Sequence, residues 1–402
     1  MVATSIKRVV SCFILSGNST RETLKIAVFH RCDTMPTFPS HWAACSGSIE
    51  EGETPFQTAS RELHEETNLL SAMPNKQQGI YVDVTFRKTE DRETIIRVYP
   101  CTVQLPPGLQ LELRGTEHDY FKFISVQELE ELNPAVPSLA RAFHHATCGK
   151  FLDRTVVSEK VLQWANDHTS GAADMARNAL ALVKDDDADP TIIRMFRPSM
   201  VAITNSMNQV IGGESVDNIL ASLDAEATRA AEYAVNELQP LLQDKSKENP
   251  LIICTFSRSS TLVKILQNLL NDNDKIQLIC SKSTPGDEGI LMAKELGGVE
   301  CIDDDDLLNL VRQDKIDVVL IGSDCVTEEN VVNKVGTKRL AEAAKTSSRA
   351  KVFCCTDRFK QWNDIFPPPL EDIFEEISID LFDKMLLPPP SLEQQCRRRL
   401  GS

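Results

Sequence analysis

The sequence has no long hydrophobic run and no C-x-x-C motif, and each absence excludes a class of protein. No stretch of the 402 residues approaches the roughly 20 apolar residues of a transmembrane helix, and residues 1–7 lack the apolar core of a signal peptide. The 12 cysteines are scattered without the C-x-x-C spacing of zinc sites. Dispersed thiols in a chain of this size favour a reducing compartment over a disulfide framework. We therefore expect a cytoplasmic protein with no membrane partner.

Positive charge is also scarce. The chain has 59 acidic and 43 basic residues, for a net charge of −16. Direct nucleic-acid binding needs a basic face and is not expected. The length predicts two or three domains, and the changes of pattern along the chain place them at residues 1–150, 151–245 and 246–402.

Carboxylates are concentrated in residues 47–69, which read G-x5-E-x7-R-E-L-x-E-E-x-N-L. Thr54, Pro55 and Gln57 form a helix start with a capping box, and the pattern predicts a helix through Thr67 that ends in a left-handed turn at Asn68. Three glutamates at i, i+3 and i+4 would crowd one helical face: Glu62, Glu65 and Glu66. Because like charges repel, a hard cation such as Mg²⁺ (or Mn²⁺) would stabilise them.

An ordinary acidic surface helix is the alternative interpretation. The glycine, the isolated Glu53 and the Arg61-Glu62 pair in one register instead resemble the Nudix box, with Asn68 where that family usually has glycine. The resemblance implies an α/β/α sandwich with a mixed sheet and metal-dependent cleavage of a nucleoside diphosphate joined to another group. It makes Glu62, Glu65 and Glu66 metal ligands and, with Arg61, the catalytic set. Glu53 could be a further ligand or act through water, and Glu117 is a candidate general base outside the box.

The flanking pattern fits this fold. Strands are predicted at residues 6–15, 23–29, 79–87, 94–103 and 119–124, and helices from Val126 and Pro137. Trp42, just before the box, could stack a base or pack in the core. Apolar spacing then predicts a helical domain with helices at residues 156–168, 171–183, 192–211 and 216–242.

From Asn249 short apolar runs alternate with helical segments, which predicts a parallel, Rossmann-like sheet with a ligand crevice past the carboxyl ends of its strands. Polar residues at those ends match a second family. The stretches 321–324 (Ile-Gly-Ser-Asp) and 333–337 (Asn-Lys-Val-Gly-Thr), with Arg197-Pro198-Ser199 and residues 254–260, resemble the initiation factor 2B-related family. That family contains regulatory subunits of translation initiation factor 2B and two sugar-phosphate isomerases, acting on methylthioribose-1-phosphate and ribose-1,5-bisphosphate.

The resemblance assigns roles in the crevice. Asp324 occupies the position of the isomerases' catalytic aspartate, but Ser257 stands where they use a cysteine, and a hydroxyl is the poorer acid and base near neutral pH. A retained ligand pocket without isomerase chemistry is therefore expected. The candidate residues for binding this ligand are Arg197, Ser257, Asn333 and Lys334. Each of them could instead form a structural ion pair or hydrogen bond.

The sequence thus predicts a Mg²⁺-dependent Nudix-type hydrolase with a nucleotide-type substrate. Its initiation factor 2B-like part would serve homodimerisation or bind a sugar phosphate or nucleotide. Two alternatives stay open: a regulatory or scaffold protein of the translation-factor type, and a sugar-phosphate isomerase.

Overall fold

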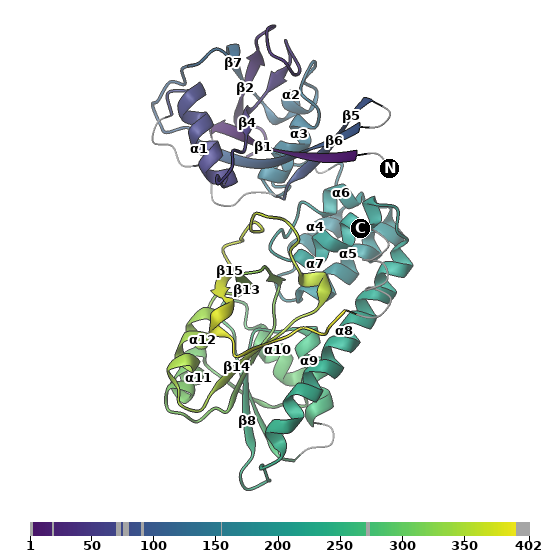
Figure 1. Ribbon diagram of the computed structural model, residues 1–402, viewed down its shortest axis with the longest axis vertical. Coiled ribbons are helices and arrows are strands. Elements are labelled where there is room, and N and C mark those ends of the chain that lie inside the picture. The colour runs from purple at the N-terminus through teal and green to yellow at the C-terminus, as the bar shows by residue number, and fades with distance from the viewer. Residues whose placement is uncertain are drawn as a thin grey trace. The chain divides into compact units, whose positions relative to one another are not determined.

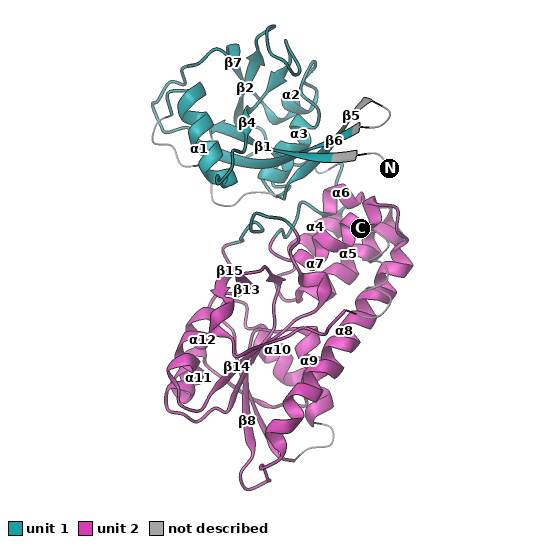
Figure 2. Ribbon diagram, viewed as in Figure 1, with its two compact units in different colours: residues 1–158, 194–198, 364–371 teal, residues 159–193, 199–363, 372–402 magenta. Residues whose placement is uncertain are grey.

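The chain forms two compact units, shown in a computed structural model that describes residues 3–17, 20–69, 74, 80–89, 92–153, 155–270 and 274–390 (Figure 2). Unit 1 contains residues 1–158, 194–198 and 364–371, and unit 2 contains residues 159–193, 199–363 and 372–402. The division into three domains at residues 150 and 245 stays a prediction. Within the described part of the chain, every helix is too short or too polar to cross a membrane.

Unit 1 is built on a seven-stranded mixed sheet (Figure 1). Its spatial order is β3-β2-β1-β6-β5, with β4 paired to β1 and β7 paired to β2. The long strands β1 and β6 are parallel, and the other pairs are antiparallel, which confirms the predicted mixed sheet. The short strands β3 and β4 were not predicted. The strands are β1 (Ala3–Ser16), β2 (Lys25–Arg31), β3 (Trp42–Ala43), β4 (Cys45–Ser48), β5 (Val82–Thr89), β6 (Arg92–Gln104) and β7 (His118–Ile124).

Helices cover both faces of this sheet, as expected for an α/β/α sandwich. Helix α1 (Pro55–Glu66) packs on one face, where its Ala59 and Leu63 join a core that includes Tyr99 of β6. Helices α2 (Val126–Glu130) and α3 (Leu139–Ala146) pack on the other face, where Phe143 meets Phe13. Trp42 is buried in this second core, as one of its two interpretations predicted.

The N-terminal part of unit 2 is helical. The single helix predicted over residues 192–211 is wrong, because the chain breaks between α6 and α7. Pro198 disfavours helical backbone at the residue before it, and Arg197 has a φ of 49°. The helices are α4 (Glu159–Ala165), α5 (Ala172–Asp186), α6 (Pro190–Ile193), α7 (Val201–Ile211), α8 (Val216–Leu238) and the 3₁₀ helix η1 (Gln239–Leu242).

The rest of unit 2 confirms the parallel Rossmann-like sheet. Six parallel strands have the order β10-β9-β8-β11-β14-β16. Helices α8, α9 and α10 pack on one face, and α11 and α12 on the other. The elements are β8 (Leu251–Phe256), α9 (Ser260–Leu270), β9 (Ile276–Ser281), α10 (Glu288–Glu295), β10 (Glu300–Ile302), α11 (Asp304–Arg312), β11 (Val318–Ile321), α12 (Thr337–Thr346), β14 (Lys351–Cys355) and β16 (Lys384–Leu386).

A small antiparallel sheet, β12-β13-β15, was not predicted. It consists of β12 (Cys325–Val326), β13 (Asn330–Lys334) and β15 (Phe374–Ser378). The 3₁₀ helix η2 (Arg358–Lys360) lies between β14 and β15, and η3 (Ile379–Leu381) lies between β15 and β16. Its middle strand carries Asn333 and Lys334, so these residues are held by strand pairing rather than by the start of a helix.

A buried histidine makes the stability of unit 1 dependent on pH. The Nδ1 of His145 donates to the Ile80 carbonyl oxygen at 3.0 Å, and burial lowers the pKa of His145 to about 3. The unfolded chain, with a histidine pKa of about 6.5, therefore takes up the proton first as the pH falls. This contribution to stability is complete above pH 6.5 and is lost between pH 6.5 and 3.

We expect the free energy of unfolding to decrease over that window by up to about 1.4 kcal/mol per pH unit from this group. Urea unfolding at stepped pH measures it. His145→Gln, which keeps a donor but cannot titrate, should show a shallower pH dependence. Equal slopes for the two proteins would contradict this account.

Candidate functional site

Helix α1 begins as the sequence predicts. Thr54 is the N-cap and its side chain accepts from the Gln57 backbone N–H, while the Gln57 side chain accepts from the Thr54 backbone N–H at 2.8 Å. Pro55 occupies the first helical position, where a missing N–H has no cost. The start of the glutamate-bearing helix is therefore fixed by local hydrogen bonds.

The end of α1 differs from the prediction. Thr67 caps the helix with an extended backbone (φ −138°), and Asn68 does not have the left-handed conformation expected of it. Its amide instead bridges to a neighbouring loop: Nδ2 donates to the Gln110 carbonyl at 2.8 Å, and Oδ1 accepts from the Glu112 N–H at 3.0 Å. These long-range hydrogen bonds favour asparagine where a left-handed turn would favour glycine.

The three glutamates of α1 do not all converge. Glu62 and Glu66 are buried, 8% and 4% exposed, whereas the Glu65 side chain is 56% exposed and lies 3.3 Å from Arg61. Among the residues that the structure describes, no group of three or more His, Cys, Asp or Glu side chains is arranged to hold a metal ion. Glu62 and Glu65 nevertheless contact the same Nη1 atom of Arg61, and the role of the three glutamates as metal ligands stays a prediction.

Among the carboxyl groups of the site, Glu66 has the pKa that departs most from its usual value. No nitrogen or oxygen donor binds either of its side-chain oxygens; the Cys45 thiol beside it acts to lower its pKa, and Nδ1 of His118 is 3.5 Å away. Burial first, and the charge of Glu62 second, raise the pKa of Glu66 to about 8. Burial also lowers the pKa of His118 to about 4, so the ring is neutral near pH 7. The sequence analysis did not identify His118, which lies 52 positions from Glu66 and has no motif of its own.

Arg61 organises the other side of the helix. Its guanidinium donates to Glu53 through Nε at 2.9 Å and Nη2 at 3.1 Å, and to Glu62 through Nη1 at 2.7 Å. Hydrogen bonds from Arg61 and Thr58 lower the pKa of Glu53 to about 2. Glu53 is thus ionised and held by Arg61 in this structure, and its role as an additional metal ligand stays a prediction.

Glu62 stands at the wall of a cavity of about 620 Å³ in unit 1. The charged groups around this cavity have both signs, since Glu117, Lys7 and Arg31 also line it. Its remaining wall is largely apolar and comes from β1, β5, β6, α3 and the loop that carries Met35 and Phe38. The sequence analysis predicted Glu117 but missed Arg31, a buried residue whose Nε donates to the Thr37 carbonyl at 3.2 Å.

These residues fit a hard divalent cation at Glu62 and Glu66. The two buried carboxylates lie one helical turn apart; Glu62 is paired with Arg61 at 2.7 Å, whereas Glu66 would carry unneutralised charge once ionised. Oxygen ligands of this kind suit Mg²⁺ or Mn²⁺, which keep further positions for water and phosphate oxygens.

Gly47 leaves the space that Glu62 occupies. A Cβ on Gly47 would lie 1.7 Å from the Glu62 Oε1 atom, so any side chain there must displace the carboxylate. If Glu62 is a metal ligand, as the Nudix resemblance implies, we expect Gly47→Ala to lower kcat/KM for the implied hydrolysis by about 10- to 100-fold, the effect typical of disturbing the orientation of such a ligand. Steady-state kinetics at saturating Mg²⁺ measure it. Gly52→Ala is the control, since a Cβ there meets no atom within 4 Å, although its φ of 85° adds some strain. Full activity of Gly47→Ala would contradict the assigned position of Glu62.

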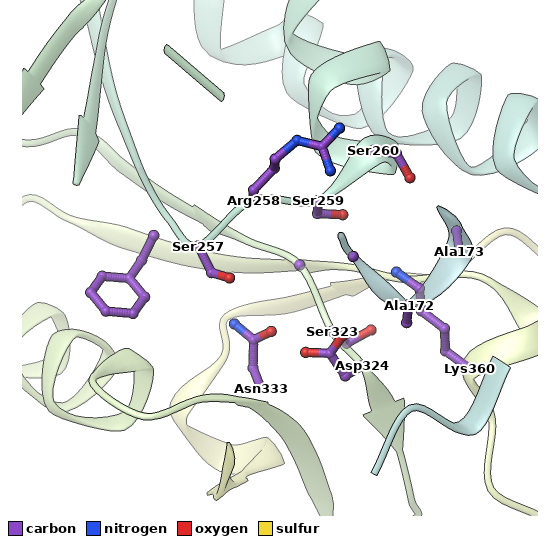
Figure 3. A pocket seen from close by; sticks show the side chains of 13 residues that line it. Ala172, Ala173, Ser257, Arg258, Ser259, Ser260, Ser323, Asp324, Asn333 and Lys360 are labelled. Atoms are coloured by element: carbon purple, nitrogen blue, oxygen red, sulfur yellow. The ribbon is translucent and has the colours of Figure 1, made fainter. Parts of the chain in front are cut away.

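Unit 2 brings three of the predicted residues together at the ends of its strands. Ser257, Asp324 and Asn333 line one pocket, with Ser323 and Lys360 (Figure 3). Its free volume is only about 10 Å³, room for about one water molecule. Ser257 follows β8 with a φ of 67°, and its hydroxyl donates to Glu288 at 3.2 Å. The sequence analysis did not identify Lys360, which enters the pocket from η2.

Lys334 is used inside the fold. It is buried, and its Nζ donates to the Ser283 carbonyl at 2.5 Å and also binds the Pro285 carbonyl and the Glu288 carboxylate. Of the described residues, Lys334 is not among those that line the pocket. Glu288 lies 46 positions earlier in the sequence and was not identified by pattern.

The remaining cations also have acidic partners. Arg197 belongs to unit 1, where its Nε donates to Glu371 at 3.0 Å. Arg258 pairs with Glu295 at 3.0 Å, and in Figure 3 its guanidinium extends away from Asp324. Lys282 pairs with Asp303 at 2.8 Å. Arg258 and Lys282 are therefore both engaged in ion pairs.

The fold and the two sites define an α/β protein that joins a Nudix domain to an initiation factor 2 subunit-type domain. The NUDIX domain model matches residues 6–146. The model of the Initiation factor 2 subunit family matches residues 155–366, more than half of the chain, and the protein belongs to that family.

Curated relatives match the second part of the chain. Ribose 1,5-bisphosphate isomerase of Archaeoglobus fulgidus is 25% identical over 158 residues, which cover 37% of this chain and 50% of the relative. A Pyrococcus horikoshii protein, described as similar to subunit 2 of translation initiation factor eIF-2B, is 32% identical over 151 residues, covering 36% of this chain and 53% of the relative. The chain thus spans about half the length of these curated relatives.

Solved structures resemble the first part. The MutT protein from Methanosarcina mazei is 16% identical and covers 37% of this chain and 96% of its own, with a TM-score of 0.28. A likeness at that TM-score carries no inference about activity.

Proposed function

We propose that unit 1 hydrolyses a nucleoside diphosphate derivative with the help of Mg²⁺ or Mn²⁺. The observation that carries the proposal is the buried pair Glu62 and Glu66 on α1, of which Glu62 lines a cavity of about 620 Å³. The match to the NUDIX domain supports a hydrolase of this general kind.

The side chains divide the work. Glu62 and Glu66 would hold the metal, with Glu65 as the third predicted ligand; a bound divalent ion neutralises phosphate charge and lowers the pKa of a coordinated water. Arg61 keeps Glu62 oriented through its hydrogen bond at 2.7 Å. Arg31, at the cavity wall, supplies positive charge for phosphate oxygens. Glu117 is placed at the same wall and is the proposed general base.

Hydrolysis of a panel of dinucleotides, nucleotide sugars and nucleoside triphosphates tests the proposal. Product release should require Mg²⁺ or Mn²⁺ and stop with a chelator. Glu62→Gln and Glu65→Gln should each lower kcat/KM, and Glu51→Gln, at an exposed position of the preceding loop, should not. Absence of turnover across the panel, with the two ligand variants indistinguishable from the parent protein, would refute the hydrolase proposal.

We further propose that unit 2 serves self-association or binds a phosphorylated ligand, and does not catalyse isomerisation. Three observations support this: Ser257 replaces a thiol, Lys334 is neutralised by Glu288, and the pocket is small. The family membership also supports the runner-up, a translation-factor-type regulatory or scaffold protein.

Two measurements separate these readings. Sedimentation gives the oligomeric state, and we expect a homodimer. Assays with ribose-1,5-bisphosphate and methylthioribose-1-phosphate should show no conversion. Turnover that is abolished by Asp324→Asn would establish the isomerase instead.

A further inference from the structure

A segment from late in the sequence is built into unit 1. Residues Asp364–Glu371 belong to this unit although they follow β14 in the chain (Figure 2). The Asp364 side chain is only 2% exposed. Its Oδ2 accepts from Arg97 Nη1 at 2.5 Å, and its Oδ1 accepts from the Tyr99 hydroxyl at 2.7 Å. Asp364 therefore accepts hydrogen bonds from two residues of β6.

The two residues bound by Asp364 alternate along β6 with residues that line the cavity. Successive side chains of a strand point to opposite faces of its sheet, so Arg97 and Tyr99 lie on the face opposite their neighbours. Those neighbours form the wall on β6: Thr94, Ile96 and Val98. A displacement of Arg97 and Tyr99 moves the backbone that carries this wall.

The same hydrogen bonds extend to β5. Asp83 accepts from Arg97 through Nε and Nη2, both at 2.9 Å, and the next residue, Val84, lines the cavity. Arg97 therefore lies between one carboxylate from β5 and another from the late segment. Two strands of the cavity wall are held by the guanidinium of Arg97, whose side chain is 15% exposed.

A second residue of the segment packs against the same core as the glutamate-bearing helix. The Phe366 ring lies edge-on to Tyr99, with centroids 5.0 Å apart, and joins the core that contains Ala59 and Leu63 of α1. The segment thus contacts β6, which carries part of the cavity wall, and it contributes to the core that also contains residues of α1, the helix of Glu62 and Glu66.

We propose that Asp364 is a positioning residue of the hydrolase. It fixes the positions of β5 and β6, which carry the cavity wall, and, with Phe366, the position of α1. This inference rests on the proposed function of unit 1. It also assigns part of the hydrolase to residues outside the range matched by the NUDIX domain model, 6–146.

Graded variants of the full chain test it. Asp364→Asn keeps the shape and an acceptor but removes the charge facing Arg97, Asp364→Ala removes both, and Tyr99→Phe removes one hydrogen bond. Ile365→Ala is the matched control, because Ile365 lies between the two anchors and is 67% exposed. With a substrate that the parent protein hydrolyses, we expect KM to rise at least tenfold in Asp364→Ala and less in Asp364→Asn, and to stay unchanged in Ile365→Ala.

A merely structural role predicts a different pattern. Loss of folded protein lowers the apparent kcat and leaves KM unchanged, and that result would overturn the proposal. If Asp364→Ala does not fold, Asp364→Asn and Tyr99→Phe decide the question by the same split between KM and kcat.

Hydrogen exchange separates this inference from the hydrolase proposal. If the parent protein hydrolyses nothing, the proposed function has failed, and amide exchange alone tests the positioning. Faster exchange confined to β5, β6 and α1 in Asp364→Asn supports the inference. Unchanged exchange in those elements, or a uniform increase across unit 1, overturns it.

Discussion

Glu66→Gln is expected to lower kcat for hydrolysis by about 10²- to 10³-fold, the effect typical of removing one electrostatic stabiliser of a transition state. The substitution preserves shape and removes the only charge that the Glu66 side chain can offer a cation. Since burial raises the pKa of Glu66 to about 8, folding of the metal-free protein near pH 7 requires this carboxyl group to take up a proton, which costs stability. We therefore expect the thermal midpoint of metal-free Glu66→Gln to equal or exceed that of the parent.

The combination of these two readouts is what tests the site. Mg²⁺ or Mn²⁺ should raise the thermal midpoint of the parent protein and have little effect on Glu66→Gln, because a ligand stabilises only the state that binds it. Glu131→Gln, at an exposed position after α2, is the control for a generic loss of negative charge. A Glu66→Gln protein that keeps both activity and the metal-dependent shift would remove Glu66 from the site.

Lys334→Met is expected to destabilise unit 2 by about 3–5 kcal/mol, the usual result of leaving one member of a buried ion pair alone. Lys334 and Glu288 are 7% and 5% exposed, and the ammonium also satisfies the Ser283 and Pro285 carbonyls. Removing the ammonium leaves a buried carboxylate and two carbonyls short of a donor. Denaturant unfolding, followed by a probe in unit 2, measures the loss.

A double-mutant cycle with Glu288 isolates the pair. Lys334→Met and Glu288→Leu together should cost much less than the sum of the single changes, since an apolar pair replaces an ion pair at modest cost. Lys282→Met, at a solvent-exposed ion pair, is the matched control and should change stability by less than about 1 kcal/mol. If Lys334→Met is as stable as the parent and only weakens binding of a sugar phosphate, Lys334 is a ligand residue rather than a structural one.

Local signals account for what the sequence predicted well. The start of α1 follows from Thr54, Pro55 and Gln57, which act within one helical turn, and the parallel sheet of unit 2 follows from apolar runs at regular spacing. Ser257 and Asp324 come to one pocket because they follow β8 and β11, and parallel strands end at the same sheet edge. Each of these inferences needs information from neighbouring residues only, or from a simple topological rule. Asn333 reaches that pocket from β13 of the small antiparallel sheet, which this rule does not predict.

The errors and omissions have a common physical origin in contacts between distant residues. Asn68 was expected to turn left-handed, but its amide is recruited by a loop more than 40 residues later. Glu65 shares the spacing of Glu62 and Glu66, but contacts with the core leave its side chain exposed and bury the other two, which spacing alone does not predict. Asp364 reaches Arg97 across 267 positions, a pairing that no periodicity encodes.

The composition of unit 1 from three separate stretches has a consequence for biosynthesis. Residue 371 leaves the ribosome 213 residues after residue 158, so at about 5–20 residues per second the emerging domain waits roughly ten to forty seconds for its final piece. During that interval the aromatic surface around Tyr99 is uncovered and available to chaperones. A recombinant fragment that stops near residue 158 would keep this surface bare, and aggregation of such fragments is the expected outcome.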